Sequence, residues 1–187
     1  MTQEFGRGVR PGDRSFKVDA DGKVRLPVVV TVLGTEKINE IECTKYELRR
    51  QDTVQTIDFL RVTDEGVFGV ARGDGTGDML KITPPQKLVG FPLRVGDKWQ
   101  YQGGGGDQKI DEAYEVVAKE SVEVPAGKFD AFHLHIVGKA PYHSVVDRWF
   151  VPEIGYVKDV TEVQRADGSL LQRITLELKE RPKAGKP

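Results

Sequence analysis

The three histidines of the chain and one aspartate have types and spacings that suit metal binding or acid–base chemistry. His133 and His135 lie two residues apart in a stretch with the alternation of a β-strand, so both point to one face of a sheet. His143 and Asp147 follow in the next predicted strand. A three-residue connection at 139–141 places Asp147 opposite His133 and puts all four side chains on one face. A two-residue connection sends His143 and Asp147 to the other face.

A shared face would bring imidazole and carboxylate groups within reach of one zinc-like ion, because directly opposed Cβ atoms lie roughly 4.5–5.5 Å apart. The alternative interpretation is a solvated sheet face, since a His-x-His pair needs further matching ligands. A catalytic triad is not indicated, because Ser144 follows His143 directly and points to the opposite face. We therefore assign no catalytic, cofactor-binding or metal-binding residue and expect no cofactor. A metal-dependent enzyme built on the histidines is the last alternative.

The elements that position these side chains are strands, because apolar and polar residues alternate along most of the chain. The stretch KVRLPVVVTVLG places one apolar set on a single face, namely Val24, Leu26, Val28, Val30 and Val32. The Asp-Gly pairs at 21–22 and 167–168 are hairpin signals. Residues 111–119 have a weak helical pattern, but their valines favour a strand. The predicted fold class is all-β, a strongly curved, open barrel-like antiparallel sheet with little or no helix.

The two halves of the chain resemble each other at an offset of about 90 residues, which suits a duplicated multi-strand unit. The stretch FLRVTDEGVFGV at 59–70 aligns with WFVPEIGYVKDV at 149–160 after a shift of one residue. We predict a single all-β domain over 1–187, with an internal repeat at approximately 23–80 and 110–180, joined by 81–109. The glycine run at 103–106 in the joining segment is interpreted as a flexible turn.

Composition excludes several function classes. The 28 basic and 29 acidic residues leave a formal net charge of −1, which argues against a nucleic-acid-binding surface. No apolar run approaches the roughly 18 residues of a transmembrane helix. The single cysteine, Cys43, cannot form a disulfide within the chain and is expected to be half-buried in a strand. The arginines at 6–14 are interpreted as part of a disordered N-terminal arm.

Three stretches together resemble a known bacterial family. They are FPLRVGDKWQYQG, then EVPAGKFDAFHLHI, then DRWFVPEIGYVK, with the shared pattern at 96–101, 124–129 and 149–158. In order and spacing this resembles the TapB-like family of unknown function, over about half of the chain. The resemblance implies a curved all-β sheet similar to the lipoprotein-carrier folds of the cell envelope, and an exported protein. It implies no catalytic or ligand residues, since none is established for the family.

The expected compartment is therefore the periplasm or the outside of the cell, with the cytoplasm as the alternative, because residues 1–8 lack the apolar stretch of a signal peptide. The leading hypothesis is a non-enzymatic envelope protein that binds a hydrophobic small molecule, a lipid or a protein partner on its concave face. The predicted lining is the alternate residues from Val24 to Val32, with Phe132, Leu134 and Ile136. The runner-up is a structural or assembly module, or a homo-oligomer, that pairs through sheet edges.

Overall fold

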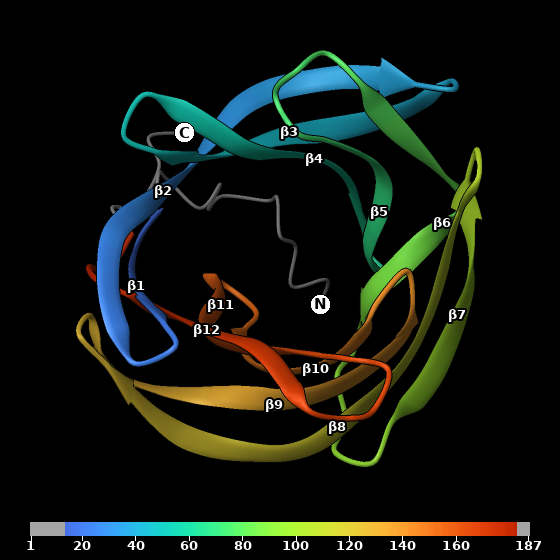
Figure 1. Cartoon of the computed structure of the whole chain (residues 1–187). Coiled ribbons are helices and arrows are strands. Elements are labelled where there is room, and N and C mark those ends of the chain that lie inside the picture. The colour runs from blue at the N-terminus through green and yellow to red at the C-terminus, as the bar shows by residue number, and fades with distance from the viewer. Residues whose placement is uncertain (1–13, 183–187) are drawn as a thin grey trace.

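The computed structural model describes residues 14–182, and these form twelve antiparallel strands that close into one barrel (Figure 1). The strands are β1 (Arg14–Ala20), β2 (Lys23–Ile38), β3 (Ile41–Arg50), β4 (Thr53–Thr63), β5 (Gly66–Gly73), β6 (Met79–Gly90), β7 (Lys98–Gly105), β8 (Gln108–Val124), β9 (Gly127–Ala140), β10 (His143–Val151), β11 (Gly155–Gln164) and β12 (Leu170–Leu178). Within 14–182 no helix that could span a membrane is found. The all-β prediction is confirmed.

The barrel is closed, whereas the sequence predicts an open one. Each strand pairs with the next along the chain, and β1 pairs with both β2 and β12. The closing ladder matches Phe16 with Leu178 and Ala20 with Ile174. This pairing joins two ends of the chain, and alternation within each strand carries no information about it. Closure leaves the inner face enclosed by strands on every side.

Local sequence explains most of the strand boundaries. Asp21 and Gly22 both have positive φ and make the tight turn between β1 and β2, as the Asp-Gly signal predicts. The turn after Val124 leads directly into β9 at Gly127. The φ of Gly127 is 127°, a backbone conformation that favours glycine. Residues 111–119 lie within β8, so the valines there indicate the strand correctly.

The core lies on the inner face of the barrel. Phe16 and Val18 from β1 are fully buried with Leu178 from β12 and Val157 from β11. A second group surrounds Leu134 of β9, with neighbours from β5, β6, β8 and β10. Cys43 is also buried rather than half-buried, because the β2–β3 hairpin and β4–β5 enclose a separate small cluster around it.

One β-bulge explains why part of the predicted lining of the concave face is wrong. Between the partners of Phe16 and Val18, the ladder from β1 to β2 shifts, so that Lys17 faces two residues of β2. The extra residue reverses the alternation. Val28 therefore points inward and is buried, whereas Val24 points outward and is 71% exposed. Val24 and Leu26 were wrongly predicted to line the concave face, while Val28 and Val30 were predicted correctly.

The glycines at 103–105 belong to strand β7 and are not a flexible turn. They allow β7 to lie against β6, since a Cβ atom on Gly105 would collide with the carbonyl oxygen of Lys81. A Cβ atom on Gly103 would meet the carbonyl oxygen of Thr83. The sequence signal for flexibility is in fact a signal for close approach of two backbones.

The internal repeat stays a prediction, although the two aligned segments share one irregularity. The ladder between β4 and β5 shifts at Phe59/Leu60, and the ladder between β10 and β11 shifts at Trp149/Phe150. These positions are aligned in the proposed repeat. Gly66 and Gly155, which begin the following strands, both have positive φ.

Candidate functional site

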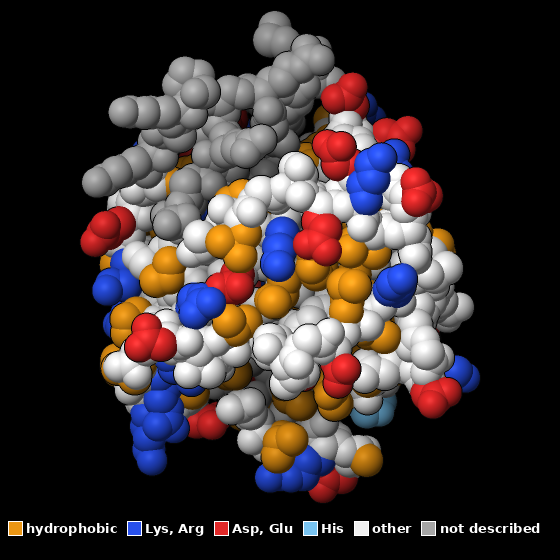
Figure 2. Space-filling view, turned by 90° about the horizontal axis from the view of Figure 1, so that it is seen from above, with side chains coloured by type: hydrophobic (Ala, Val, Ile, Leu, Met, Phe, Trp, Pro, Cys, Tyr) orange, Lys and Arg blue, Asp and Glu red, His pale blue; other side chains and the backbone are white. Residues whose placement is uncertain are grey.

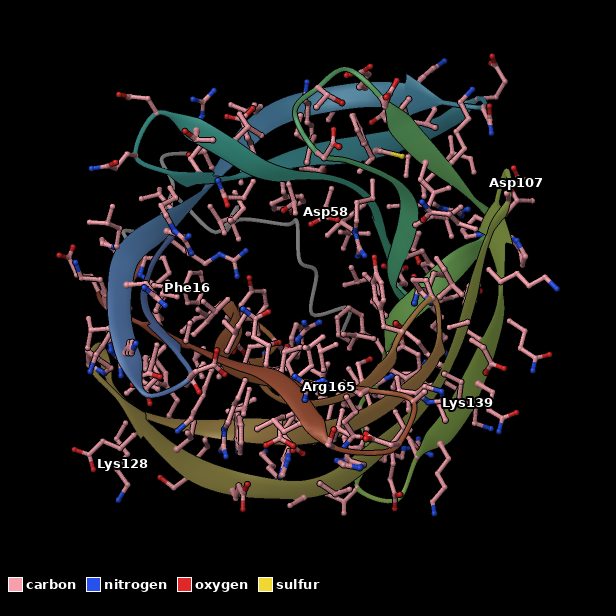
Figure 3. The ribbon with its side chains drawn as sticks, viewed as in Figure 1. Phe16, Asp58, Asp107, Lys128, Lys139 and Arg165 are labelled. Atoms are coloured by element: carbon pink, nitrogen blue, oxygen red, sulfur yellow. The ribbon has the colours of Figure 1, made fainter. Side chains whose placement is uncertain are left out.

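Nine polar side chains extend from seven strands on the inner face of the barrel, and we call them the interior network. They are Arg14, Asp58, Arg72, Gln86, Glu112, Tyr114, Arg148, Tyr156 and Asp159. In Figure 3, Phe16 and Asp58 point into the barrel, whereas Lys128 points away from it. The network thus shares the inner face with the apolar core.

The centre of the network is a buried ion pair between β10 and β11. The Nε and Nη2 atoms of Arg148 both lie 2.7 Å from Oδ2 of Asp159, and Thr161 donates its hydroxyl to Oδ1 at 2.8 Å. Burial lowers the pKa of the Arg148 guanidinium, but the carboxylate of Asp159 outweighs burial and leaves the pKa raised. The guanidinium also lies 5.0 Å from the ring centroid of Tyr156.

A second group joins β6 to β8. The amide nitrogen of Gln86 donates to Oε2 of Glu112 at 2.6 Å and to the hydroxyl oxygen of Tyr114 at 2.8 Å. Tyr114 in turn donates its hydroxyl to the same Glu112 oxygen. Burial and the adjacent carboxylate both raise the pKa of Tyr114, so its hydroxyl stays protonated as a donor. The side chain of Gln86 is buried, so this group is held rigidly in place.

The third group lies at one end of the barrel, where β4 and β5 meet the interior. Arg72 Nε donates to Asp58 Oδ1 at 2.9 Å, and 52% of the Arg72 side chain is exposed. Arg72 also lines a hollow of about 390 Å³, together with Thr56, Leu80 and Gln108 among others. The polar network is therefore continuous with an opening at the surface.

Charges in the interior network balance. Three arginines oppose two aspartates and one glutamate, and each acid accepts a hydrogen bond from a neighbour in the network. Beside the network stands an apolar wall from β12, β1, β2 and β3. Tyr156 joins the two, because its ring stacks on Phe16 at 5.1 Å between centroids. Val30 is buried in this wall, and Leu48 and Leu176 pack against it with part of their surface exposed.

The histidines lie on the outer face of the sheet. Asp147 accepts contacts from both rings at Oδ1, with His133 Nε2 at 2.7 Å and His135 Nδ1 at 2.9 Å. The other ring nitrogen of His133 lies 3.1 Å from Oε1 of Glu120. Trp149 stacks on His133 with centroids 4.4 Å apart and donates its indole N–H to the same Glu120 oxygen at 2.8 Å. Burial raises the pKa of Asp147, but the two histidine hydrogen bonds outweigh it and leave the pKa lowered.

The predicted register of this outer cluster is displaced by two residues. Asp147 lies opposite His135 and not opposite His133, whose partner is Trp149. The shift is even, so the predicted common face of His133, His135 and Asp147 is found. His143 has the same parity, but it lies four residues from Asp147, which is about 13 Å along a strand. Among residues 14–182 no three His, Cys, Asp or Glu side chains are arranged to hold a metal ion.

Arg14 was predicted as part of a disordered arm, but it is a buried residue of β1 whose guanidinium lies 5.3 Å from the ring centroid of Tyr156. The rest of that predicted arm lies outside the described residues. Phe132, Leu134 and Ile136 of the predicted lining are on the inner face, where Leu134 is fully buried. On the face seen in Figure 2, acidic and basic side chains are interspersed among hydrophobic ones.

The interior network was missed at the level of sequence, although a signal for it exists. Val146, Arg148 and Phe150 are alternate residues of one strand and therefore share a face. Arg148 is thus a charged residue on an otherwise apolar face. In the same way, Asp159 lies two residues after Val157 and shares its apolar face. Charged residues at core positions need partners, and a search for such positions would have found both members of the pair.

Comparisons with known proteins identify the fold. No family model matches the chain, and no curated protein matches it. The chain is similar to the crystal structure of a candidate exported protein with a YmcC-like fold from Bacteroides fragilis NCTC 9343. The identity is 16% and the TM-score 0.50, over 92% of this chain and 96% of that chain.

Two further crystal structures cover a similar share. One is a candidate lipoprotein from Parabacteroides distasonis ATCC 8503, with 15% identity and a TM-score of 0.44 over 90% of this chain and 93% of that chain. The other is the hypothetical lipoprotein YmcC from Escherichia coli K12, with 8% identity and a TM-score of 0.44 over 97% and 93%. The likeness to the Bacteroides fragilis structure establishes that this chain has an all-β fold of the YmcC-like kind.

Proposed function

We propose that the protein is a non-enzymatic bacterial envelope protein that binds an amphipathic small molecule inside its barrel. The observation that carries this proposal is the interior network, a set of paired polar groups that stands beside an apolar wall on the same enclosed face. Pockets for small molecules combine mostly apolar walls with a few polar groups that orient the ligand. The predicted hydrophobic ligand is thereby narrowed to one with a polar end.

Export is part of the proposal. It is supported by the resemblance of 96–101, 124–129 and 149–158 to the TapB-like envelope family, and by the description of the Bacteroides fragilis structure as a candidate exported protein. Expression of the native gene with its own upstream region, followed by release of the periplasm, tests the compartment. Recovery of the protein with cytoplasmic markers alone would contradict export.

The charge balance of the interior network narrows the class of ligand further. Three positive and three negative side chains give the network no net charge to attract an anion or a cation. They offer both donors and acceptors, which suits an uncharged or zwitterionic polar end. The apolar wall around Phe16 and Leu176 suits an acyl or other hydrocarbon part.

The direct test uses a zwitterionic monoacyl phosphocholine that carries a fluorophore whose emission rises in apolar surroundings. Purified, delipidated protein is titrated with this probe, and bound probe is displaced with three unlabelled competitors: monoacyl phosphocholine, monoacyl phosphoglycerol and monoacylglycerol. We expect saturable binding at one site per chain, with the anionic competitor the weakest. Absence of saturable binding would overturn the proposal. So would a rise in probe fluorescence no larger than the rise in buffer without protein.

A charge substitution locates the site. Glu112→Gln keeps the acceptor for Gln86 and Tyr114 but leaves the network with a net positive charge. We expect the anionic competitor to gain roughly fivefold, which corresponds to about 1 kcal/mol for one charge at intermediate range in a medium of intermediate dielectric constant. The matched control is Glu115→Gln on the same strand, whose carboxylate pairs with Lys98 on the outer face. Equal shifts in both variants would place the ligand elsewhere.

A further inference from the structure

One seam of the barrel lacks the backbone ladder that joins all other neighbouring strands. Strands β6 and β7 are matched at a single position, Thr83 with Gly104. Every other neighbouring pair is matched along at least five positions. Near the right edge of Figure 1 the two strands meet, and from there they diverge. The seam is therefore closed at Thr83 and widens toward Gly90 and Lys98, where the connection 91–97 joins the two strands.

The sequence explains both ends. At the closed end, Gly103 and Gly105 lie against the carbonyl oxygens of β6, where any side chain would collide. Beyond it, Pro84 and Pro85 have no N–H group to donate to a ladder. Antiparallel strands without these hydrogen bonds are held together only by their side chains.

Side chains close the wide part of the seam. The hydroxyl of Tyr101 donates to the carbonyl oxygen of Pro84 at 2.5 Å, and the indole N–H of Trp99 donates to the carbonyl oxygen of Lys87 at 3.0 Å. Both donors belong to β7 and both acceptors to β6. Two side-chain hydrogen bonds thus take the place of the backbone hydrogen bonds that join the other neighbouring strands.

The interior network lies directly behind this seam. The ring of Trp99 stacks on Tyr114 at 4.9 Å between centroids, with 9° between the planes. Gln86, which binds Tyr114 and Glu112, is itself a residue of β6. At the wide end the surroundings are apolar, since Leu88, Phe91, Leu93 and Trp99 pack in one cluster. A hydrocarbon chain that passes between β6 and β7 would meet this apolar cluster first and the polar network next.

We propose that the barrel opens sideways between β6 and β7, and that an amphipathic ligand enters the interior through this seam. The inference rests on the proposed function, because it names the route to the same site. The two hydrogen bonds from Trp99 and Tyr101 act as the latch, while the close contact of Gly103 and Gly105 with β6 and the connection 91–97 hold the two ends of the seam. Opening exposes few backbone hydrogen bonds, which makes this seam the least costly place for the sheet to part.

The test removes the two hydrogen-bond donors of the latch. The double variant Trp99→Phe with Tyr101→Phe loses both donors and keeps an aromatic ring at each position. Amide hydrogen exchange of 86–90 and 98–102 is expected to accelerate about fivefold for each lost bond, and roughly 25-fold for both. Exchange of the β8–β9 ladder should stay unchanged, which reports that the variant is folded. The matched control is Trp149→Phe with Tyr142→Phe, which removes an indole bond and an exposed hydroxyl away from the seam.

Stopped-flow measurements with the fluorescent monoacyl phosphocholine provide the second readout. We expect the association and dissociation rates of the probe to rise together by a similar factor, with less than a twofold change in Kd, because a latch changes the barrier and not the bound state. Faster seam exchange with unchanged probe rates would overturn lateral entry in favour of entry through an end of the barrel. Exchange at the seam equal to that of the control variant would also overturn it. Absence of probe binding to the unmodified protein would instead refute the proposed function.

Discussion

The buried pair of Arg148 and Asp159 offers the sharpest test of how the interior is built. Asp159 is 5% exposed, and both guanidinium contacts lie on one of its oxygens. Removal of one partner from a buried pair costs roughly 3–5 kcal/mol, because the remaining charge is left without compensation. Since 29% of the Arg148 side chain is exposed, we expect the lower end, about 3 kcal/mol, for Arg148→Met.

The assay is a double-mutant cycle in the free energy of unfolding from urea titration. It compares Arg148→Met, Asp159→Asn and the double variant, and the double variant should cost much less than the sum of the singles. We expect a coupling energy of about 2 kcal/mol for this pair. The control cycle is Arg173→Met with Glu162→Gln, an exposed pair between β12 and β11 at 3.4 Å, with an expected coupling below about 1 kcal/mol. Equal coupling in both cycles would refute the view that Arg148 and Asp159 lie in an enclosed interior.

Three further predictions concern single positions. The lowered pKa of Asp147 means that its hydrogen bonds with the histidines stabilise the fold above about pH 4, its ordinary pKa, and that this contribution is lost as pH falls through the folded pKa. Urea midpoints of Asp147→Asn should therefore differ from those of the unmodified protein above about pH 4 and approach them as pH falls through the lowered folded pKa. Gly105→Ala should lower the melting temperature by several degrees because its Cβ would collide with β6, whereas Gly69→Ala, with its nearest neighbour at 3.7 Å, should have little effect, and similar melting curves for the two would contradict the close approach. Val28→Ala should cost about 2 kcal/mol and Val24→Ala less than about 0.5 kcal/mol in urea titrations, and the reverse order would show that the bulge in β2 is absent.

Alternation along the chain was sufficient to predict the strands, since parity depends only on neighbours in sequence. It placed Val28 and Val30 on the inner face correctly, and it placed His133, His135 and Asp147 on a common face. It failed for Val24, because one extra residue opposite Lys17 reverses parity, and Pro27 within that bulge is the only local sign of it.

What the sequence could not supply was the distant pairing. Closure needs β1 to meet β12, and the glycines at 103–105 have their role only because β6 passes against them. The interior network is assembled from seven strands, so its members are separated by up to 145 residues, from Arg14 to Asp159. Each looks like an isolated polar residue until the barrel brings it to the others.

The strand that closes the barrel is also the first of the twelve to emerge during synthesis or export. Until β12 has been made, β1 has one neighbour, and the nascent sheet carries two bare lateral edges that accept strands from other molecules. The vulnerable period for aggregation is therefore set by the time the polypeptide takes to deliver its last strand, and holdase chaperones would act most usefully before that moment. A refolding chain faces the same long loop closure, so slow final docking of the two terminal strands is expected to dominate its kinetics.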